Sequence, residues 1–182
     1  VISSGQNEEK IFEILENVKP VRGRMELAAT KKNGATVYVD YAHTPDAIEV
    51  ALKSLKPHIL GKLIVIIGAG GERDEGKRPL MGKAAEKNSD FVIITDDNPR
   101  KEDPSLIHQM IKNGIQDNGK VMVIADRAEA ILKAVDLLDT GDGLLIAGKG
   151  HETEQFIGEN IFPFDDFEQA SLSVASLDGV EQ

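Results

Sequence analysis

Hydrophobic residues beyond the first third of the chain stand in short continuous runs. The runs cover residues 63–67, 91–95, 121–124 and 144–147. Segments with the spacing of amphipathic helices lie before and between them, at residues 46–55, 78–87, 105–115 and 127–138. Apolar runs without alternation are typical of strands that helices cover on both faces. The pattern therefore predicts an α/β fold, a Rossmann-like doubly wound domain with right-handed crossovers and a mostly parallel sheet.

The N-terminal part of the chain carries a different pattern. Residues 7–18 have helical spacing with acidic residues in the first turn, and a proline follows. The segments 25–30 and 35–40 flank the dipeptide Asn33-Gly34, which is a strong turn signal between two strands. We therefore predict a helix at the start of the chain and then an N-terminal β-hairpin.

The C-terminal part predicts two short elements. Residues 162–164 indicate an edge strand, and residues 166–177 indicate a closing helix, followed by a frayed tail at residues 178–182. With the hairpin included, the predicted sheet has about six strands.

Composition and charge narrow the function. The 182 residues suffice for one domain with a full core, and the net charge of −10 with 4% aromatic residues argues against nucleic-acid binding. The absence of cysteine excludes disulfides, thiolate metal sites and thiol nucleophiles, and it fits a cytoplasmic protein. We expect no contact with a membrane, because no apolar run approaches about 20 residues and no signal peptide is visible. Since the chain opens with Val1, we expect it to be a fragment or a processed chain.

Polar, glycine-rich or charged clusters follow each predicted strand. They are DYAHTPD (40–46), GAGGERDEGKRP (68–79), DDNPRKEDP (96–104), ADRAEA (125–130) and GKGHE (148–152). Ligands of open α/β sheets bind beyond the carboxyl ends of the strands. We therefore expect the five clusters to converge on one rim of the sheet.

The segment GERDEGKR nearly spells a phosphate-binding P-loop. Arg78 stands where a P-loop needs a hydroxyl for Mg²⁺, and Pro79 suits the first turn of a helix that starts around Lys77. The dinucleotide fingerprint fails too, because Arg73 replaces its third glycine. The residues alone leave two alternatives open: a solvated flexible loop, or an arginine-bearing loop for an anionic ligand.

Two further clusters carry groups that suit an amino acid. Asn98 and Arg100 flank a proline, so an amide with donor and acceptor and a planar guanidinium would project side by side. In GKGHE, glycines allow close approach and Glu152 can bind an ammonium group. The alternatives are an Asn-Pro turn with an exposed arginine, and a helix start with Glu152 in its first turn. His43 can contact a phosphate or only fill a turn, and the four histidines show no metal-site spacing.

Taken together and in this order, the clusters resemble the C-terminal domain of the Mur ligases of peptidoglycan synthesis. The segments that carry the resemblance are GRME (23–26), DYAHTPD, GAGGERDEGKRPLMG (68–82), TDDNPR (95–100), DRAEAI (126–131) and AGKGHE (147–152). The resemblance covers about residues 20 to 175. Its DNPR motif is similar to that of the branch that adds diaminopimelate.

The resemblance implies how the chain is divided and what the whole protein does. Residues 1–20 would end a central ATPase domain, and residues 21–182 would form the amino-acid-binding domain. The implied activity is the ATP-dependent addition of meso-diaminopimelate to UDP-MurNAc-L-Ala-D-Glu. ATP and Mg²⁺ are the implied cofactors, with the P-loop and the metal ligands in the missing part of the central domain. We expect no catalytic residue and no metal ligand in this chain, and no ligase activity of the chain alone.

The resemblance also implies site residues. The diaminopimelate pocket falls on Arg73, Asp97, Asn98, Arg100, Gly148 and Glu152, and contacts to ATP ribose and phosphates fall on Arg24, Asp40 and His43. Diaminopimelate has two carboxylates and two ammonium groups. Two arginines can clamp a carboxylate, the Asn98 amide can bridge, and Glu152 with the Gly148 backbone can hold the distal end.

Other functions stay open at this point. One alternative is a stand-alone Rossmann-like module that binds a nucleotide or an amino acid. Another is the equivalent domain of a lysine-adding or folylpolyglutamate-type ligase. The folylpolyglutamate alternative shares the fold but gives no reason for DNPR together with GKGHE.

Overall fold

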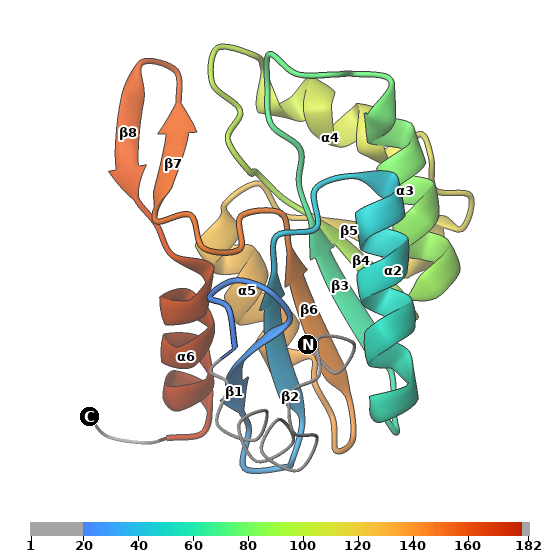
Figure 1. Ribbon diagram of the computed structural model, residues 1–182, viewed down its shortest axis with the longest axis vertical. Helices are drawn as coiled ribbons and strands as arrows, with labels where there is room; N and C mark the ends of the chain where they lie inside the picture. The colour runs from blue at the N-terminus through green and yellow to red at the C-terminus, as the bar shows by residue number, and fades with distance from the viewer. Residues whose placement is uncertain (1–19, 180–182) are drawn as a thin grey trace, which may run out of the picture.

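The computed structural model describes residues 20–179, and Figure 1 shows a central sheet between two layers of helices. The main sheet has the strand order β1-β2-β6-β3-β4-β5. Its strands are β1 (Glu26–Thr30), β2 (Thr36–Asp40), β3 (Leu63–Ile67), β4 (Phe91–Ile94), β5 (Val121–Val123) and β6 (Gly143–Ala147). The α-helices are α2 (Pro45–Leu55), α3 (Lys77–Asn88), α4 (Pro104–Lys112), α5 (Arg127–Asp136) and α6 (Asp166–Leu177). Short 3-10 helices, η2 (Lys56–His58) and η3 (Asn118–Lys120), lead into β3 and β5.

The strand pairing confirms the predicted fold class. β1 is antiparallel to β2, as the hairpin prediction requires, and the pairs β2–β6, β6–β3, β3–β4 and β4–β5 are all parallel. The predicted helix at 7–18 and the predicted domain end at 1–20 lie outside the described residues, apart from residue 20. Within residues 20–179, no helix has both the length and the apolar character that crossing a bilayer requires.

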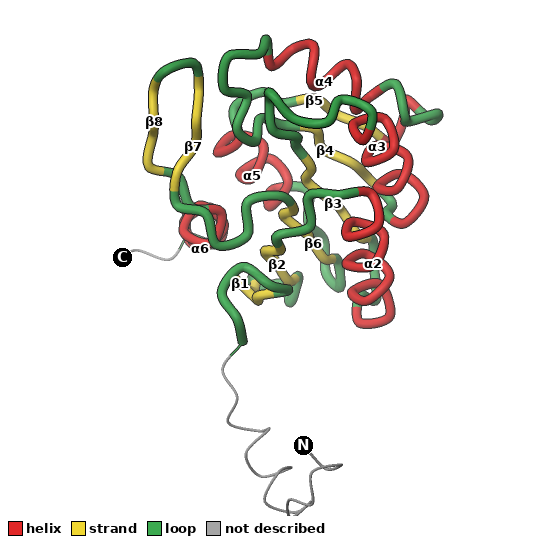
Figure 2. The backbone as a smooth tube through the Cα atoms, turned by 45° about the horizontal axis from the view of Figure 1, so that its top comes forward, coloured by secondary structure: helices red, strands yellow, loops and turns green. Residues whose placement is uncertain are grey.

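The continuous apolar run of β3 reflects helices on both faces of the sheet (Figure 2). Leu63, Val65 and Ile67 pack in one core cluster with residues of α2, α3 and α4. Ile64 and Ile66 belong to a second cluster with residues of α5 and α6. Because consecutive strand residues point to opposite faces, every position of β3 is buried and none needs to be polar.

Helix ends follow local capping. Thr44 caps α2, where its side chain accepts a hydrogen bond from Ala47 N (3.3 Å), and Pro45 is the first helical residue. α4 ends at Lys112, three residues before the predicted end. Gly114 follows it and lies so close to α3 that a Cβ there would be 1.8 Å from Pro79 O. The backbone after α4 thus packs directly against α3 where α4 ends, and the spacing of apolar residues in the sequence does not indicate this contact.

The prediction of a strand at 162–164 is confirmed for residues 162 and 163, but its place at the edge of the main sheet is wrong. Residues Asn160–Pro163 form β8, which pairs with β7 (Glu154–Ile157) as a separate two-stranded hairpin that projects beyond the main sheet (Figure 1). All four residues of β8 are exposed, so no burial pattern marks the strand. Gly158, with φ +60, lies in the turn, and its N–H donates to Arg100 O (2.7 Å). The β7–β8 hairpin therefore contacts the DNPR segment through a backbone hydrogen bond.

The strand order places a topological switch beside β3. The chain runs outward from β3 to β4 and β5 and then returns to insert β6 between β2 and β3. The loops after β3 and β6 leave toward opposite sides at such a point and open a crevice between them. A ligand site is expected at the carboxyl ends of β2, β6, β3 and β4.

Candidate functional site

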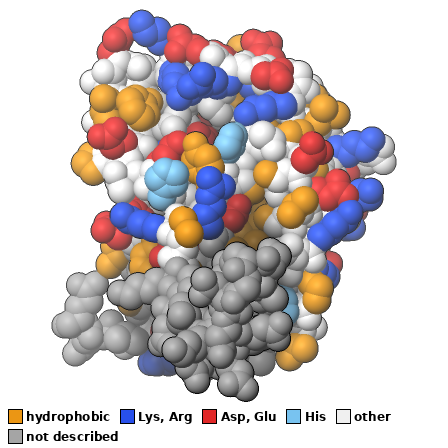
Figure 3. Space-filling view, viewed as in Figure 1, with side chains coloured by type: hydrophobic (Ala, Val, Ile, Leu, Met, Phe, Trp, Pro, Cys, Tyr) orange, Lys and Arg blue, Asp and Glu red, His pale blue; other side chains and the backbone are white. Residues whose placement is uncertain are grey.

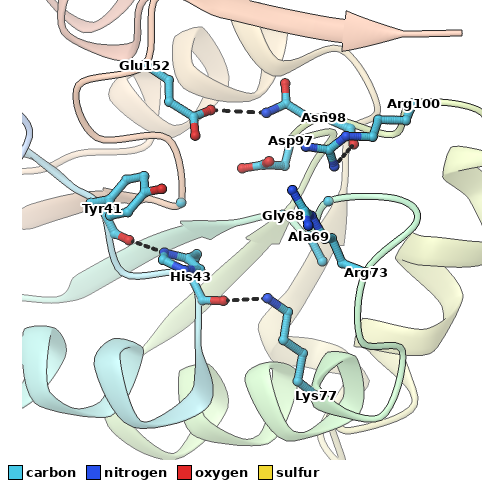
Figure 4. A pocket seen from close by; sticks show the side chains of 12 residues that line it. Tyr41, His43, Gly68, Ala69, Arg73, Lys77, Asp97, Asn98, Arg100 and Glu152 are labelled. Atoms are coloured by element: carbon cyan, nitrogen blue, oxygen red, sulfur yellow. Dashed lines mark hydrogen bonds between the residues drawn. The ribbon is translucent and has the colours of Figure 1, made fainter.

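A cavity of about 310 Å³ lies at the switch point. Figure 3 shows histidine, basic and acidic side chains meeting near the middle of the face that Figure 1 presents. The residues that line the cavity come from the loops after four strands, and most are labelled in Figure 4. They are Tyr41, His43, Gly68, Ala69, Gly70, Arg73, Lys77, Asp97, Asn98, Arg100, Gly148 and Glu152.

The structure brings all six predicted diaminopimelate residues to this one cavity, together with His43. Arg24 and Asp40 are not among its lining residues. The Arg24 guanidinium stacks 4.6 Å from the centre of the Tyr41 ring. The Asp40 carboxylate accepts hydrogen bonds from Met25 N (2.7 Å) and Ala42 N (2.8 Å), so it braces the turn after β2.

Asn98 is only 4% exposed and is bonded to protein on both ends of its amide. Its Oδ1 accepts from Lys149 Nζ (3.0 Å) and from Phe156 N (3.0 Å), and its Nδ2 donates to Glu152 Oε2 (3.0 Å). The expectation that this amide offers both a donor and an acceptor to ligand is therefore wrong for the acceptor. Nδ2 has two N–H groups, one of which bonds Glu152, so Asn98 can offer the other N–H to a ligand.

GKGHE folds as a turn and not as a helix start. The N–H of Glu152 donates to Lys149 O (3.0 Å), and β7 follows at Glu154. Gly148 has φ +119, and a Cβ on it would lie 2.8 Å from Asp97 Oδ2, so only glycine lets these loops meet here. The Gly148 N–H donates to Asp40 O (3.1 Å) and is not free for a ligand.

Arg100 is held in an unusual conformation. Its φ of +52 lies in the left-handed region, which is strained for a residue with a side chain. β7 holds this backbone, because Arg100 N donates to Phe156 O (3.0 Å). The guanidinium Nη1 donates to Gly71 O (2.9 Å), and within the described residues the other guanidinium nitrogens are left for a ligand. The alternative of an exposed arginine on a simple turn does not hold.

The loop that resembled a P-loop is a braced arginine loop. Arg78 is fully buried, and its Nη2 lies 2.9 Å from Glu102 Oε2 and donates to Gly70 O (3.3 Å). Arg73 lines the cavity, as does Lys77, whose Nζ donates to His43 O (3.0 Å). Arg78 therefore braces the loop that presents Arg73, which favours the anionic-ligand alternative over a free solvated loop.

The cluster after β5 does not line the cavity, but its Arg127 binds the backbone of segments next to the cavity. Arg127 is buried and pairs with Asp166 through Nε–Oδ1 and Nη2–Oδ2, both at 2.7 Å. It also donates to Asp96 O (3.2 Å) and Ala147 O (3.1 Å), which are in the segments after β4 and at the end of β6. Burial lowers the pKa of Arg127, but the Asp166 carboxylate outweighs it and raises this pKa above its ordinary value. Four of the five predicted clusters thus line the cavity, and the fifth ties two of them together.

Sequence reasoning missed several lining residues. Tyr41, Lys77 and the glycine-rich backbone at 68–70 line the cavity without having been assigned a role. Tyr41 and residues 68–70 come directly after predicted strands, and Lys77 stands at the predicted start of a helix; these positions were the available signal. In the part of the chain that the structure describes, no three residues of the types His, Cys, Asp and Glu are grouped to hold a metal ion.

Fold and cavity together define a Rossmann-like domain with a ligand site of mixed charge at the strand ends. The family model of the Mur ligase glutamate ligase domain matches residues 23–150, and the chain belongs to this family.

Two curated relatives are both UDP-N-acetylmuramoyl-L-alanyl-D-glutamate–2,6-diaminopimelate ligases. That of Bradyrhizobium diazoefficiens is 46% identical over 96% of this chain and 35% of its own length. That of Synechococcus elongatus is 48% identical over 92% of this chain and 34% of its own length. The chain thus spans about a third of the length of these relatives.

Solved structures agree with this placement. A structure of a UDP-N-acetylmuramoyl-L-alanyl-D-glutamate–2,6-diaminopimelate ligase is 38% identical, with a TM-score of 0.81 over 96% of this chain and 36% of that one. A folylpolyglutamate synthase from Thermotoga maritima is 28% identical, with a TM-score of 0.56 over 78% of this chain and 31% of that one. The backbone is thus much more similar to the first.

Proposed function

We propose that this chain is the amino-acid-binding domain of an ATP-dependent ligase that joins meso-diaminopimelate to UDP-MurNAc-L-Ala-D-Glu. The observation that carries the proposal is the charge of one cavity. Two guanidinium groups, Arg73 and Arg100, and two carboxylates, Asp97 and Glu152, line the same space. This set matches an amino-acid end with its paired carboxylate and ammonium, and the names of the relatives point to the same substrate.

The cavity has groups for both charges of the amino-acid end of diaminopimelate, its carboxylate and its ammonium. Arg100 is pre-positioned through Gly71 O and its β7 contact, so little side-chain entropy is lost when it binds a carboxylate. Glu152 keeps Oε1 for an ammonium, since Oε2 accepts from Asn98. In this proposal Arg73 and Arg100 hold a carboxylate, and Glu152 and Asp97 hold the ammonium beside it.

The domain would act by orientation. In an amide ligase of this kind the γ-carboxylate of D-glutamate becomes an acyl phosphate, the amine of diaminopimelate attacks it, and phosphate leaves. Holding the distal amino-acid end fixes the direction of the reacting amine. We propose that ATP and Mg²⁺ are bound mainly outside this domain, with Arg24, Asp40 and His43 approaching the nucleotide on closure. Residues 1–20 would end the central ATPase domain, and the protein would work in the cytoplasm, where ATP is available.

Three other functions have less support. Lysine lacks the second carboxylate, so a lysine-adding ligase has less use for two arginines beside two carboxylates. Folylpolyglutamate synthases share the fold at lower similarity. A stand-alone binding module gives no reason for the family match.

Phosphate release from ATP by the full-length protein, measured with and without meso-diaminopimelate, tests the proposal. Arg100→Ala should raise the KM for diaminopimelate by about 10- to 100-fold, because a charge-assisted hydrogen bond to a carboxylate is lost. Lys101→Ala is the matched control, since Lys101 is the adjacent cation, is 63% exposed and pairs with Glu159 on the hairpin. An Arg100→Ala enzyme with unchanged diaminopimelate-dependent turnover would refute the assignment.

A further inference from the structure

Lys149 is a buried cation at the back of the proposed pocket that is not one of its lining residues. Its side chain is fully buried, whereas most lysines keep their ammonium in water. Three acceptors surround Nζ: Asn98 Oδ1 at 3.0 Å, Glu152 Oε2 at 3.2 Å and Glu154 O at 2.6 Å. An ammonium has three N–H donors, so the number of acceptors matches the number of donors.

These contacts fix which polar atoms Asn98 can show to a ligand. Lys149 Nζ and Phe156 N both donate to Oδ1, so a flipped amide would set an NH₂ group against two donors. Nδ2 therefore faces Glu152 and the cavity, and Asn98 can only donate to a ligand. The neighbour of Asn98 on the cavity wall is Arg100, which is also a donor.

The same ammonium also fixes the neighbouring carboxylate of Glu152. It lies against Glu152 Oε2, which also accepts from Asn98 Nδ2, so this carboxylate is held from two sides and Oε1 is the oxygen left for a ligand. One buried residue thus contacts both Asn98, a donor to the ligand, and Glu152, an acceptor.

We propose that Lys149 is a positioning residue that sets the order of donors and acceptors in the pocket and thereby the preference for a substrate with a distal carboxylate and ammonium. The inference rests on the proposed function. Without the Lys149 ammonium, Phe156 N is the one donor left of the two that hold Asn98 Oδ1, so the amide is held less firmly in the orientation that presents its N–H to a carboxylate. The Glu152 carboxylate then loses its buried partner. Lysine has no distal carboxylate, so its use as a substrate depends less on this order.

The test uses the full-length protein with Lys149→Met, a substitution of similar length that cannot donate hydrogen bonds. The KM for diaminopimelate should rise by about 10- to 100-fold, as for other groups that orient a ligand-binding residue. The KM values for ATP and for UDP-MurNAc-L-Ala-D-Glu should stay within about twofold. The ratio of kcat/KM for diaminopimelate to that for lysine should fall, and Lys149→Gln, which can still donate to Asn98, should restore part of it.

Lys101→Met is the matched control, because it removes an exposed lysine from the DNPR loop; all its kinetic constants should stay at wild-type values. If Lys149→Met leaves the KM for diaminopimelate and the substrate ratio unchanged, or raises all three KM values equally, the positioning role is wrong. If the wild-type protein shows no diaminopimelate-dependent turnover, the proposed function fails and the inference fails with it.

A second variant decides the matter if Lys149→Met does not fold. Asn98→Asp keeps the size of the side chain and gives Lys149 a carboxylate acceptor, but it replaces the Nδ2 donor with an oxygen. The new oxygen faces Glu152 Oε2, so a lower melting temperature is expected, and in the folded enzyme the KM for diaminopimelate should rise while the KM for ATP stays within about twofold. An Asn98→Asp enzyme with an unchanged KM would overturn the claim that Lys149 makes this residue a donor.

Discussion

We predict that the buried cation Arg127 contributes several kcal/mol to the free energy of unfolding. Arg127→Met removes two 2.7 Å hydrogen bonds to Asp166 and the bonds to Asp96 O and Ala147 O, and it leaves the Asp166 carboxylate buried without its partner. Losing one partner of a buried ion pair costs about 3–5 kcal/mol. For a chain of this size that corresponds to a fall in melting temperature of about 6–20 °C.

Denaturant unfolding followed by circular dichroism measures this loss. Lys133→Met is the matched control on the same helix, because Lys133 makes only an exposed pair with Asp136 and should cost less than about 1 kcal/mol. The raised pKa of Arg127 means that its contribution is present at every pH below the ordinary arginine pKa. The gap to wild type is therefore measured near pH 7, where Arg127 is fully charged. A loss below about 1 kcal/mol would refute the reasoning, since the buried carboxylate would then have found another partner.

Two further predictions concern a loop of the site and the opposite end of the sheet. Gly71→Ala should cost about 1–3 kcal/mol and weaken diaminopimelate binding, because a Cβ there would lie 1.9 Å from a backbone oxygen of the DNPR loop. Gly76→Ala, whose nearest neighbour would be a side-chain oxygen at 3.2 Å, is its control for both thermal melts and binding titrations, and equal effects of the two would contradict the close-approach argument. Burial raises the pKa of Asp90, but hydrogen bonds from Lys56 and Leu63 N outweigh burial and lower this pKa below the ordinary 3.8. Asp90→Asn should therefore cost less than about 1 kcal/mol at neutral pH, and the gap should close as pH falls through the lowered pKa of the folded state; a gap that widens in acid would show the opposite sign.

Much of the fold could be predicted because its signals are local. The strand at 63–67 has the predicted ends, since a fully buried strand shows as an unbroken apolar run. The closing helix at 166–177 also has the predicted ends, with the Asp165 side chain accepting from Phe167 N and Glu168 N at its start. The β7–β8 hairpin was not predicted, because its second strand is exposed throughout and the hairpin is held by a backbone contact with Arg100.

The loops of the site could be predicted, but not the state of each side chain. The rule that ligands bind at strand ends selects the right loops, because it follows from topology. Lys149 and Arg78 stand in polar clusters of the sequence, yet both side chains are fully buried. Their burial depends on partners more than 20 positions away in the sequence, Asn98 and Glu102. Spacing along the chain carries no information about such pairs.

The most direct test of the account is a crystal structure of the full-length protein with meso-diaminopimelate. The account predicts one carboxylate of the ligand within hydrogen-bond distance of the Arg73 and Arg100 guanidinium groups, and the adjacent ammonium within the same distance of Glu152. Diaminopimelate bound elsewhere, or the phosphates of ATP between these two arginines, would contradict it.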